Sequence, residues 1–287
     1  MKSGLVTGTH RRHVEVELPD GMPLVCAVKG RRLAPICGDV VDIESQGEHE
    51  GVVIAVHPRR SELSRADAYK QKTVGANVSL VLGVVAVEPA FNPELIDRWT
   101  VAAEGAQCRF ALLLNKMDLP GADAVRESLR NYEALGYPLI ALSAKTEIPK
   151  LRSIINGEQS VLVGQSGMGK STIINALLGV NRAKTGEISV SLNAGKHTTT
   201  STRLHRLDAS TWIIDSPGMK EFGVHQLAGA LDHAFVEFRP YLGQCRFRDC
   251  THDREPQCAI RAAVANGKIA ASRLDTYHRL QNEIVHN

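Results

Sequence analysis

Residues 164–172 read Gly-Gln-Ser-Gly-Met-Gly-Lys-Ser-Thr, a stretch with the spacing G-x-x-x-x-G-K-S. Such a loop binds phosphate, because its glycines let consecutive backbone N–H groups face one anion and the helix that follows adds positive potential. Lys170 would reach the β- and γ-phosphates, and the Ser171 hydroxyl would bind Mg²⁺. We therefore predict a nucleoside triphosphate site made of Gly164, Gln165, Ser166, Gly167, Met168, Gly169, Lys170, Ser171 and Thr172.

The segments on either side of this loop match the structure that it needs. Residues 160–163 are mostly apolar and predict a short strand, and residues 173–178 predict a helix that ends at Gly179, a typical C-terminal cap. A glycine-rich turn with a chance lysine is the alternative interpretation. The flanking strand and helix favour the phosphate loop.

A second candidate loop carries residue types that recognise a purine base. The apolar run 110–114 ends in the tetrapeptide Asn115, Lys116, Met117 and Asp118. The Asp118 carboxylate accepts hydrogen bonds from guanine N1–H and from the exocyclic amine, which adenine does not offer in this arrangement. A site built around these bonds rejects the wrong base, because the carboxylate is left unpaired. Lys116 is expected along the base plane, and Asn115 is expected to tie neighbouring loops together.

A third loop follows the apolar run 138–142 and contains Ser143, Ala144 and Lys145. There a backbone N–H can meet guanine O6, and the lysine stem can cover the ring. The N-K-x-D tetrapeptide is weak evidence alone. Combined with this loop and with the phosphate loop, it predicts a guanine nucleotide site.

The segment after the phosphate loop is predicted to complete a Mg²⁺ site. Residues 195–200 read Gly-Lys-His-Thr-Thr-Thr, and a predicted β-hairpin over 202–207 and 211–214 ends in Asp-Ser-Pro-Gly. An Asp at the end of an apolar strand downstream of the phosphate loop suits Mg²⁺ binding behind the direct ligands. The candidate Mg²⁺ residues are Ser171, Thr199, Thr200 and Asp215, and the Gly218 amide is expected to sense the γ-phosphate.

The motifs occur in the order base, base, phosphate, threonines and aspartate, whereas most GTPases have the phosphate loop first. This order is physically harmless, since ligand loops of an open α/β sheet gather at the carboxyl ends of the strands whatever their order along the chain. One consequence is that the segment after Gly218 runs directly into the C-terminal residues. Loss of a phosphate contact is therefore expected to tilt that C-terminal domain.

The residue that orients the attacking water is not the usual one. In many GTPases a glutamine follows the D-x-x-G motif, but Met219 stands at this position and has no group for the purpose. His197 is the nearest replacement, because a neutral imidazole can accept from a water or orient it near neutral pH. A surface histidine without a role is the alternative. We predict that His197 is catalytic.

Four soft ligands lie within fourteen residues near the C-terminus: Cys245, Cys250, His252 and Cys258. Three thiolates and an imidazole suit a closed, structural Zn²⁺ site with no open coordination position. The segment contains few apolar residues, so the metal is expected to be required for local folding. Cys26, Cys37 and Cys108 are scattered and are expected to be small core residues.

The first sixty residues alternate short strand-like runs with turns. Residues 14–18, 24–28, 38–43 and 51–56 predict strands of a small barrel, and a five-stranded oligonucleotide-binding barrel fits best. An unspecialised β-barrel is the alternative. Basic clusters at 10–13, 29–32 and 57–60 suit either an RNA-binding patch or a solvated rim, and charge alone does not decide between them. Residues 59–72 are polar and are interpreted as a linker, and residues 275–285 predict a final helix packed on the nucleotide-binding domain.

Length and composition set further bounds. The chain has 287 residues, a net charge of +3 and 43% hydrophobic residues, which suits two or three globular domains. No signal peptide is recognised, and the longest apolar run, 80–87, is too short to span a bilayer. Six cysteines without a secretory signal favour metal ligation in a reducing compartment. We expect a cytoplasmic protein that does not contact membranes.

With these residues assembled, the chain resembles the circularly permuted GTPases of the RsgA (YjeQ) family, which act on the small ribosomal subunit. The resemblance covers nearly the whole chain, and Lys196, where arginine is expected, is its one departure among the motifs. It implies a multidomain protein: an oligonucleotide-binding β-barrel at 1–68, a permuted α/β P-loop GTPase domain at 69–222 and a small α-helical zinc-binding domain at 223–287. The motifs that carry the resemblance are 115–118, 164–172, 195–200, 215–218 and Cys245/Cys250/His252/Cys258.

The resemblance also implies a function. It predicts a GTPase that binds rRNA, docks on the maturing small ribosomal subunit, is stimulated by it and helps release assembly factors, with His197 as the catalytic histidine. One Zn²⁺ and a Mg²⁺ that accompanies GTP are the implied cofactors, and a monomer is expected. Two alternatives stay open: a GTP-gated RNA-binding scaffold with little turnover, and a permuted GTPase that acts on the large subunit or another RNA.

Overall fold

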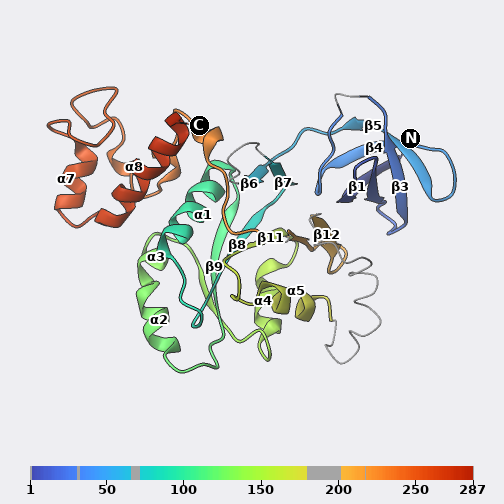
Figure 1. The fold of residues 1–287 in the computed structure, drawn as a ribbon, viewed down its shortest axis with the longest axis horizontal. Helices are drawn as coiled ribbons and strands as arrows, with labels where there is room; N and C mark the ends of the chain where they lie inside the picture. The colour runs from blue at the N-terminus through green and yellow to red at the C-terminus, as the bar shows by residue number, and fades with distance from the viewer. Residues whose placement is uncertain (1, 31–32, 66–71, 180–201, 217, 287) are drawn as a thin grey trace.

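Five short strands at the N-terminus close into a barrel with the order β1-β2-β3-β5-β4 and a final β4–β1 pairing (Figure 1). The structure is a computed structural model that describes residues 2–30, 33–65, 72–179, 202–216 and 218–286. The closed five-stranded barrel confirms the predicted oligonucleotide-binding type of fold. Its strands are β1 Lys2–Thr9, β2 His13–Glu17, β3 Pro23–Val28, β4 Val40–Ser45 and β5 Glu50–Val56.

The barrel interior follows the alternation of the sequence. Val14 and Val16 of β2 are buried while their neighbours face outward, and Cys26 of β3 is fully buried as a small core residue. The four predicted runs correspond to β2–β5. No strand was predicted for β1, where glycines weaken the pattern. Gly4 is required there, because a Cβ atom would come within 2.6 Å of Val16 Cγ1.

The segment after the barrel is folded, and the linker predicted for 59–72 is wrong over 61–65. Strands β6 Glu62–Arg65 and β7 Lys72–Ala76 pair antiparallel. Leu63 is 1% exposed and belongs to the core of the central unit, and Asn77 Nδ2 donates to the Gly38 carbonyl of the barrel at 2.8 Å. Polar composition suggested a linker here, but these side chains pack or form hydrogen bonds with distant segments.

The central unit is a sheet with the order β10-β9-β8-β11-β13-β12. All neighbours are parallel except β12, which is antiparallel to β13. Every residue of β8 is buried, as is typical of a strand covered on both faces. The strands are β8 Leu80–Ala86, β9 Arg109–Asn115, β10 Leu139–Ala141, β11 Gln159–Val163, β12 Arg203–Arg206 and β13 Trp212–Asp215.

Helices cover both faces of this sheet (Figure 1). One face packs against α1 Pro93–Gly105, α2 Ala122–Ser128 and α3 Arg130–Ala134. The other packs against α4 Ile148–Ile155 and α5 Lys170–Leu177. Helix α1 starts where it does because Asn92 Oδ1 accepts from Glu94 N and Pro93 occupies the first helical position.

The barrel is joined to the edge of the central sheet through β12. Gly8 of β1 pairs with Arg203, so one eleven-stranded sheet runs through both units. Ion pairs reinforce the junction: Arg203 with Glu15 at 3.3 Å, and Arg206 with Glu17 at 2.8 Å. Strand β12, which follows residues 180–201, is therefore fixed to the barrel.

The C-terminal residues form a small helical unit beside α1 (Figure 1). Its core contains Phe235, Phe238 and Tyr277, whose rings contact one another. The predicted packing of the final helix on the nucleotide-binding unit is confirmed, since α8 contacts α1. The elements are the 3₁₀ turns η2 His225–Leu227, η3 Asp232–Ala234 and η4 Arg239–Tyr241, followed by α7 Ala259–Ala265 and α8 Ala271–His286. Among the described helices, none has the length and apolar composition to cross a bilayer.

A buried ionic network holds this unit to α1. The Arg273 side chain, 5% exposed, donates to Asp97 Oδ1 at 2.9 Å and to Glu237 Oε1 at 2.5 Å. Thr276 Oγ1 and Tyr132 OH donate to the same Asp97 carboxylate at 2.9 and 2.8 Å. Each charge therefore has hydrogen-bond partners, which is the condition for burying it without a large penalty.

We expect the variant Arg273→Met to be strongly destabilised, because it leaves the Asp97 and Glu237 carboxylates buried without their cation. Breaking a buried pair on one side costs about 3–5 kcal/mol. Denaturant unfolding followed by circular dichroism measures the loss. Arg254→Ala is the matched control, since the Arg254 side chain is 93% exposed, and its cost should stay below about 0.5 kcal/mol. Equal unfolding midpoints for the two variants would contradict the importance of the network.

Candidate functional site

The predicted nucleotide-binding loops lie at one edge of the central sheet. Strands β8, β9, β10, β11 and β13 are parallel, so their carboxyl ends share this edge. The loop with Asn115 and Asp118 follows β9, the loop with Ser143 follows β10, and the phosphate loop follows β11. Asp215 is the last residue of β13. The edge is where open α/β sheets bind ligands.

The phosphate loop depends on two close backbone approaches. Gly169 has φ +93°, and a Cβ atom there would lie 2.3 Å from Asn115 Nδ2. A Cβ on Gly164 would lie 2.4 Å from the Val84 carbonyl oxygen. Both positions therefore require glycine. Gln165 Oε1 accepts from the Asn92 N–H at 2.9 Å, which ties the loop to the start of α1.

Lys170 and Asp215 lie at the predicted phosphate end of this edge, and their charges influence each other. The Lys170 ammonium donates to the carbonyl oxygens of Gly164 at 2.5 Å and Gln165 at 2.9 Å. Burial lowers the pKa of Lys170, and the Asp215 charge opposes this shift. Burial raises the pKa of Asp215, while His205 and Lys170 oppose that shift. Burial thus disfavours both charges, and a bound phosphate or divalent cation would stabilise them.

A cavity of about 540 Å³ occupies this edge. Its lining includes Gly169, Lys170, Ser171 and Thr172 from the start of α5, and Asp215 from β13. The other lining residues are Lys116, Ser166, Gly167, Ser216, Gly218 and Lys220. The cavity thus brings Lys170, Ser171 and Asp215 together with Lys116 of the predicted base-binding tetrapeptide, whereas Thr199 and Thr200 lie outside the described residues.

Asn115 joins the phosphate loop to both base-binding loops. Its Nδ2 donates to the Met168 carbonyl at 3.0 Å, and its Oδ1 accepts from the Ala144 N–H at 3.0 Å. The side chain is buried, so neither bond competes with bulk water. These two hydrogen bonds are the contacts between loops that were predicted for Asn115.

Asp118 lies beside the Ser143–Lys145 loop. Its carboxylate accepts from Ser143 Oγ at 2.8 Å and from Lys145 Nζ at 3.0 Å. These donors, Ser143 first and Lys145 second, hold the pKa of Asp118 below its usual value. The carboxylate is therefore an ionised, acceptor-only group at neutral pH, as recognition of two guanine donors requires.

The other residues of the two predicted base-binding loops are held by hydrogen bonds to neighbouring segments. Lys116 has φ +63°, and its ammonium donates to the Glu88 carbonyl at 2.6 Å. The Met117 N–H donates to the Leu142 carbonyl at 3.3 Å. Glu147 Oε2 accepts from the Ser143 N–H at 2.9 Å, which shapes the loop that contains Ala144. Glu147, the N-cap of α4, is not among the predicted site residues, although it lies only four positions after Ser143.

Three predicted residues lie outside the described part of the chain: His197, Thr199 and Thr200. Met219, which replaces the usual glutamine, is fully buried in the core. Lys220 was not predicted but lines the cavity. Its position two residues beyond the D-S-P-G motif was the signal available in the sequence.

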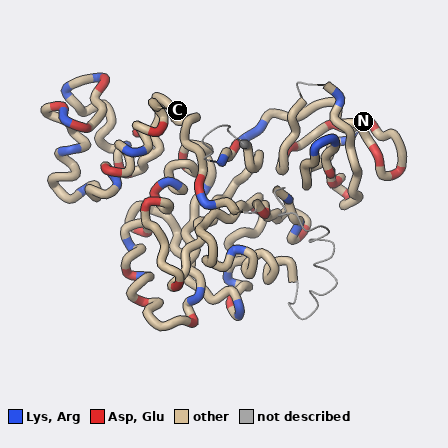
Figure 2. Tube along the Cα trace, in the orientation of Figure 1, with Lys and Arg blue, Asp and Glu red and all other residues tan. Residues whose placement is uncertain are grey.

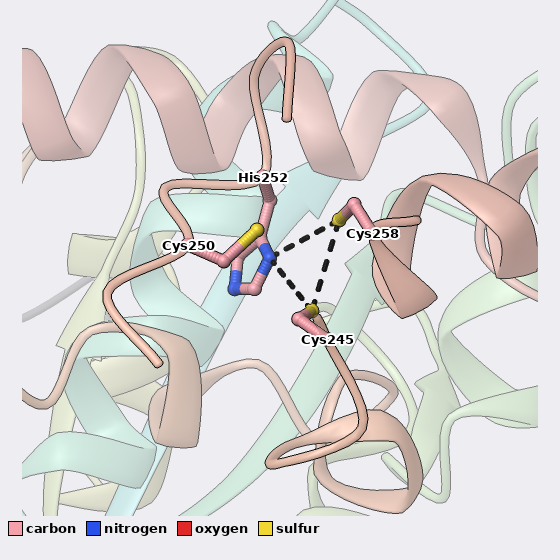
Figure 3. A group of neighbouring side chains, drawn as sticks. All are labelled: Cys245, Cys250, His252 and Cys258. Carbon is pink, nitrogen blue, oxygen red and sulfur yellow. Dashed lines mark hydrogen bonds between the residues drawn. The ribbon is translucent and has the colours of Figure 1, made fainter. Parts of the chain in front are cut away.

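The four predicted metal ligands converge in the C-terminal unit (Figure 3). Their ligand atoms all lie within 4.8 Å of one another. His252 Nδ1 is 3.3 Å from Cys258 Sγ and 3.7 Å from Cys245 Sγ. Burial lowers the pKa of His252, which favours the neutral imidazole that binds metals. This Cys₃His cluster can hold a metal ion.

The backbone around the cluster supports thiolate ligands. Cys258 is the N-cap of α7, and its sulfur accepts from the Arg261 N–H at 3.5 Å. Cys245 Sγ accepts from the Ala259 N–H at 3.4 Å. N–H groups and a helix N-terminus stabilise negative sulfur. His252 has φ +63°, a strained conformation that brings its ring toward the sulfurs.

The basic clusters of the barrel have mixed roles. Arg59 is a structural residue that pairs with Asp39 at 2.8 Å, and His57 contacts Asp42 at 3.0 Å. Arg11 and Arg12 are exposed. Figure 2 shows Lys and Arg over all three units, interspersed with Asp and Glu. The described surface therefore offers scattered cations, and some of the predicted patch is used within the barrel.

Comparison with known proteins identifies the family. The model described as RsgA GTPase matches residues 56–225. The chain is 42% identical over 283 residues to the small ribosomal subunit biogenesis GTPase RsgA of Nitrosomonas europaea, covering 97% of this chain and 90% of that protein. It is 43% identical to the protein of the same name from Neisseria gonorrhoeae, with coverages of 98% and 92%.

Solved structures agree with this assignment. YjeQ from Thermotoga maritima superposes with a TM-score of 0.77 at 30% identity and covers 100% of this chain and 99% of its own. YloQ, described as a circularly permuted GTPase, shows the same fold with a TM-score of 0.74 at 23% identity, with coverages of 100% and 96%. The chain, whose motifs reach one sheet edge in permuted order, therefore belongs to the RsgA family of circularly permuted GTPases.

Proposed function

We propose that this protein hydrolyses GTP as a switch in the late maturation of the small ribosomal subunit. The observation that carries the proposal is the Asn115 junction, which holds a phosphate loop and a guanine-type Asp118 loop together in a member of a GTPase family. The printed name of the curated relatives supports the ribosomal role. In this proposal the protein binds rRNA, is stimulated by the small subunit and helps release assembly factors.

The proposed GTP contacts divide between the base and the phosphates. Asp118 accepts from guanine N1–H and the amine, while Lys116 and Lys145 lie along the ring. A backbone N–H of the Ser143–Lys145 loop meets O6, and residues 164–172 surround the phosphates, with Gly218 at the γ-phosphate. The full set is Asn115, Lys116, Met117, Asp118, Ser143, Ala144, Lys145, 164–172 and Gly218.

Mg²⁺ is proposed to bind with GTP at Ser171 and Asp215, together with Thr199 or Thr200. Hard oxygen ligands suit this ion. When bound, Mg²⁺ neutralises charge on the β- and γ-phosphate oxygens. His197 is proposed to orient the attacking water, since the buried Met219 side chain cannot take the part that glutamine has elsewhere.

Zn²⁺ is the proposed occupant of the Cys₃His cluster. Thiolate and imidazole ligands in a closed set of four are typical of structural zinc. When bound, the ion crosslinks the loop 245–258, which contains few apolar residues. The segment with Phe238 and Tyr277 then keeps its contacts with His252.

Three domains are proposed: 1–68, 69–222 and 223–287. The first boundary falls within 66–71, outside the described residues, and the β6–β7 pairing joins its two sides. We also propose that the protein is cytoplasmic, where ribosomal particles would be its partners, and that it is a monomer. The names of the curated relatives do not favour the two alternatives, a GTP-gated RNA scaffold with little turnover and a GTPase of the large subunit, although Met219 in place of the usual glutamine suits the scaffold.

GTP hydrolysis in the presence of purified ribosomal subunits tests the main proposal. We expect strong stimulation by small subunits and none by large subunits. His197→Ala should lose most single-turnover hydrolysis while keeping its affinity for GTP. Tight GTP binding without stimulation by either subunit would favour the scaffold, and stimulation by large subunits alone would contradict the small-subunit role.

Base selectivity is expected to change in Asp118→Asn. An amide donates where the carboxylate accepted, so the variant should prefer xanthine nucleotides and bind GTP at least tenfold more weakly, a discrimination of about 1.4 kcal/mol or more. Competition between GTP and XTP measures it. Asp123→Asn, an exposed site in the first turn of α2, should keep the GTP preference. An Asp118→Asn protein that still prefers GTP would refute the assignment.

Zinc removal is expected to unfold the C-terminal unit locally. The purified chain should contain one zinc per molecule, and a strong chelator should lower its thermal midpoint. Cys250→Ser should lose the metal, whereas Cys26→Ala, in the barrel core, should keep it. A chain that contains zinc in equal amount in both variants would show that the cluster is not the metal site.

A further inference from the structure

A second lysine lies at the phosphate end of the cavity. Lys220 lines it together with Lys170, Gly167 and Ser171, which belong to the phosphate loop and α5. Lys220 comes two residues after Gly218, where the chain leaves β13 and turns toward the C-terminal unit. The side chain is exposed, and among the described residues no carboxylate forms an ion pair with it.

The backbone that carries Lys220 is fixed on both sides. The Gly164 N–H donates to the Met219 carbonyl at 3.2 Å, and Trp99 Nε1 donates to the Lys220 carbonyl at 2.8 Å. Arg98 donates to the Phe222 carbonyl at 3.1 Å. The side chains of Met219 and Phe222 are fully buried. The backbone at Lys220 is thus held by the phosphate loop and by α1, and this fixes the point from which the exposed side chain reaches the cavity.

The charges at this end of the cavity favour a polyanion. The pKa of Lys170 is lowered first by burial, and the charge of Lys220 lowers it further, although Asp215 acts in the opposite direction. Two ammonium groups that repel each other are both stabilised when a phosphate group binds near them. Fixed cations aimed at developing charge lower the barrier to phosphoryl transfer, because they need no reorganisation during the reaction.

We propose that Lys220 is a further catalytic residue of this GTPase, whose ammonium contacts the γ-phosphate oxygens. This inference rests on the proposed function. In hydrolysis a water oxygen forms a bond to the γ-phosphorus, and the bond to the β–γ bridging oxygen breaks with its electron pair on GDP. One water proton stays on the attacking oxygen and the other moves to a second oxygen of the released phosphate. Lys220 keeps its own proton throughout and neutralises charge on the oxygens of the transferred group.

Single-turnover GTP hydrolysis with Lys220→Ala, Lys220→Arg and Glu221→Gln tests the inference. The hydrolysis rate of Lys220→Ala should fall about tenfold to a hundredfold. This loss is small for the removal of one charge-stabilising group, because solvent reaches the site and weakens each charge. The affinity of this variant for GTP should fall more than its affinity for GDP. Lys220→Arg should recover most of the rate. Glu221→Gln, an exposed neighbour outside the cavity, should match the wild type.

Thermal unfolding of the variants separates a chemical from a structural role. The Lys220 side chain is exposed, and surface substitutions usually change stability by less than about 0.5 kcal/mol, so all midpoints should agree within a few degrees. A wild-type protein that hydrolyses GTP, with Lys220→Ala equal to it in rate and in the GTP-to-GDP affinity ratio, would overturn the inference alone. A wild-type protein that does not bind GTP would overturn the proposed function as well.

Discussion

The site depends on a single buried amide, the side chain of Asn115. It donates to the Met168 carbonyl in the phosphate loop and accepts from the Ala144 N–H in the second base loop. The close approach leaves no room for a side chain at Gly169, so the phosphate loop is built around this contact. A buried amide that lost either partner would pay a desolvation penalty of about 1–3 kcal/mol. The three loops therefore form one arrangement rather than three independent ones.

The permuted order of the motifs becomes intelligible from the sheet. The base loops, the phosphate loop and Asp215 follow parallel strands, so their meeting point depends on strand order in space rather than on order in the chain. The permuted order instead determines which other parts of the chain are joined to the strands that carry the site. β12 is joined to the barrel because its Arg203 pairs with Gly8 of β1. The segment beyond Asp215 runs past α1, where Trp99 contacts the Lys220 carbonyl, to the C-terminal unit. Both neighbours of the nucleotide site are thereby joined directly to its phosphate end.

Much of the candidate site is predictable from the local spacing of residues in the sequence. Features that depend on contacts between distant segments are not. The phosphate loop, the Asp118 tetrapeptide and the Cys₃His cluster were identified because each is a short pattern with its own chemistry. The polar composition of residues 59–72 indicates a linker, whereas the groups that Ser61 and Leu63 contact lie in other segments and leave no local signal. Lys220 was missed for the same reason, since the indole that holds its carbonyl is 121 positions away. The Arg273–Asp97 pair spans 176 positions, and neither residue is recognisable alone.

Helix α1 contacts three functional regions along a length of about 20 Å, as expected for its 13 residues. At its start Asn92 meets Gln165 of the phosphate loop; further along, Trp99 holds Lys220, and Asp97 binds Arg273 of α8. Helix α1 therefore links the phosphate loop, the segment with Lys220 and the C-terminal unit that contains the Cys₃His cluster. A large partner that bound both the C-terminal unit and the barrel would therefore contact the two units that are joined to this site, one through β12 and the other through α1.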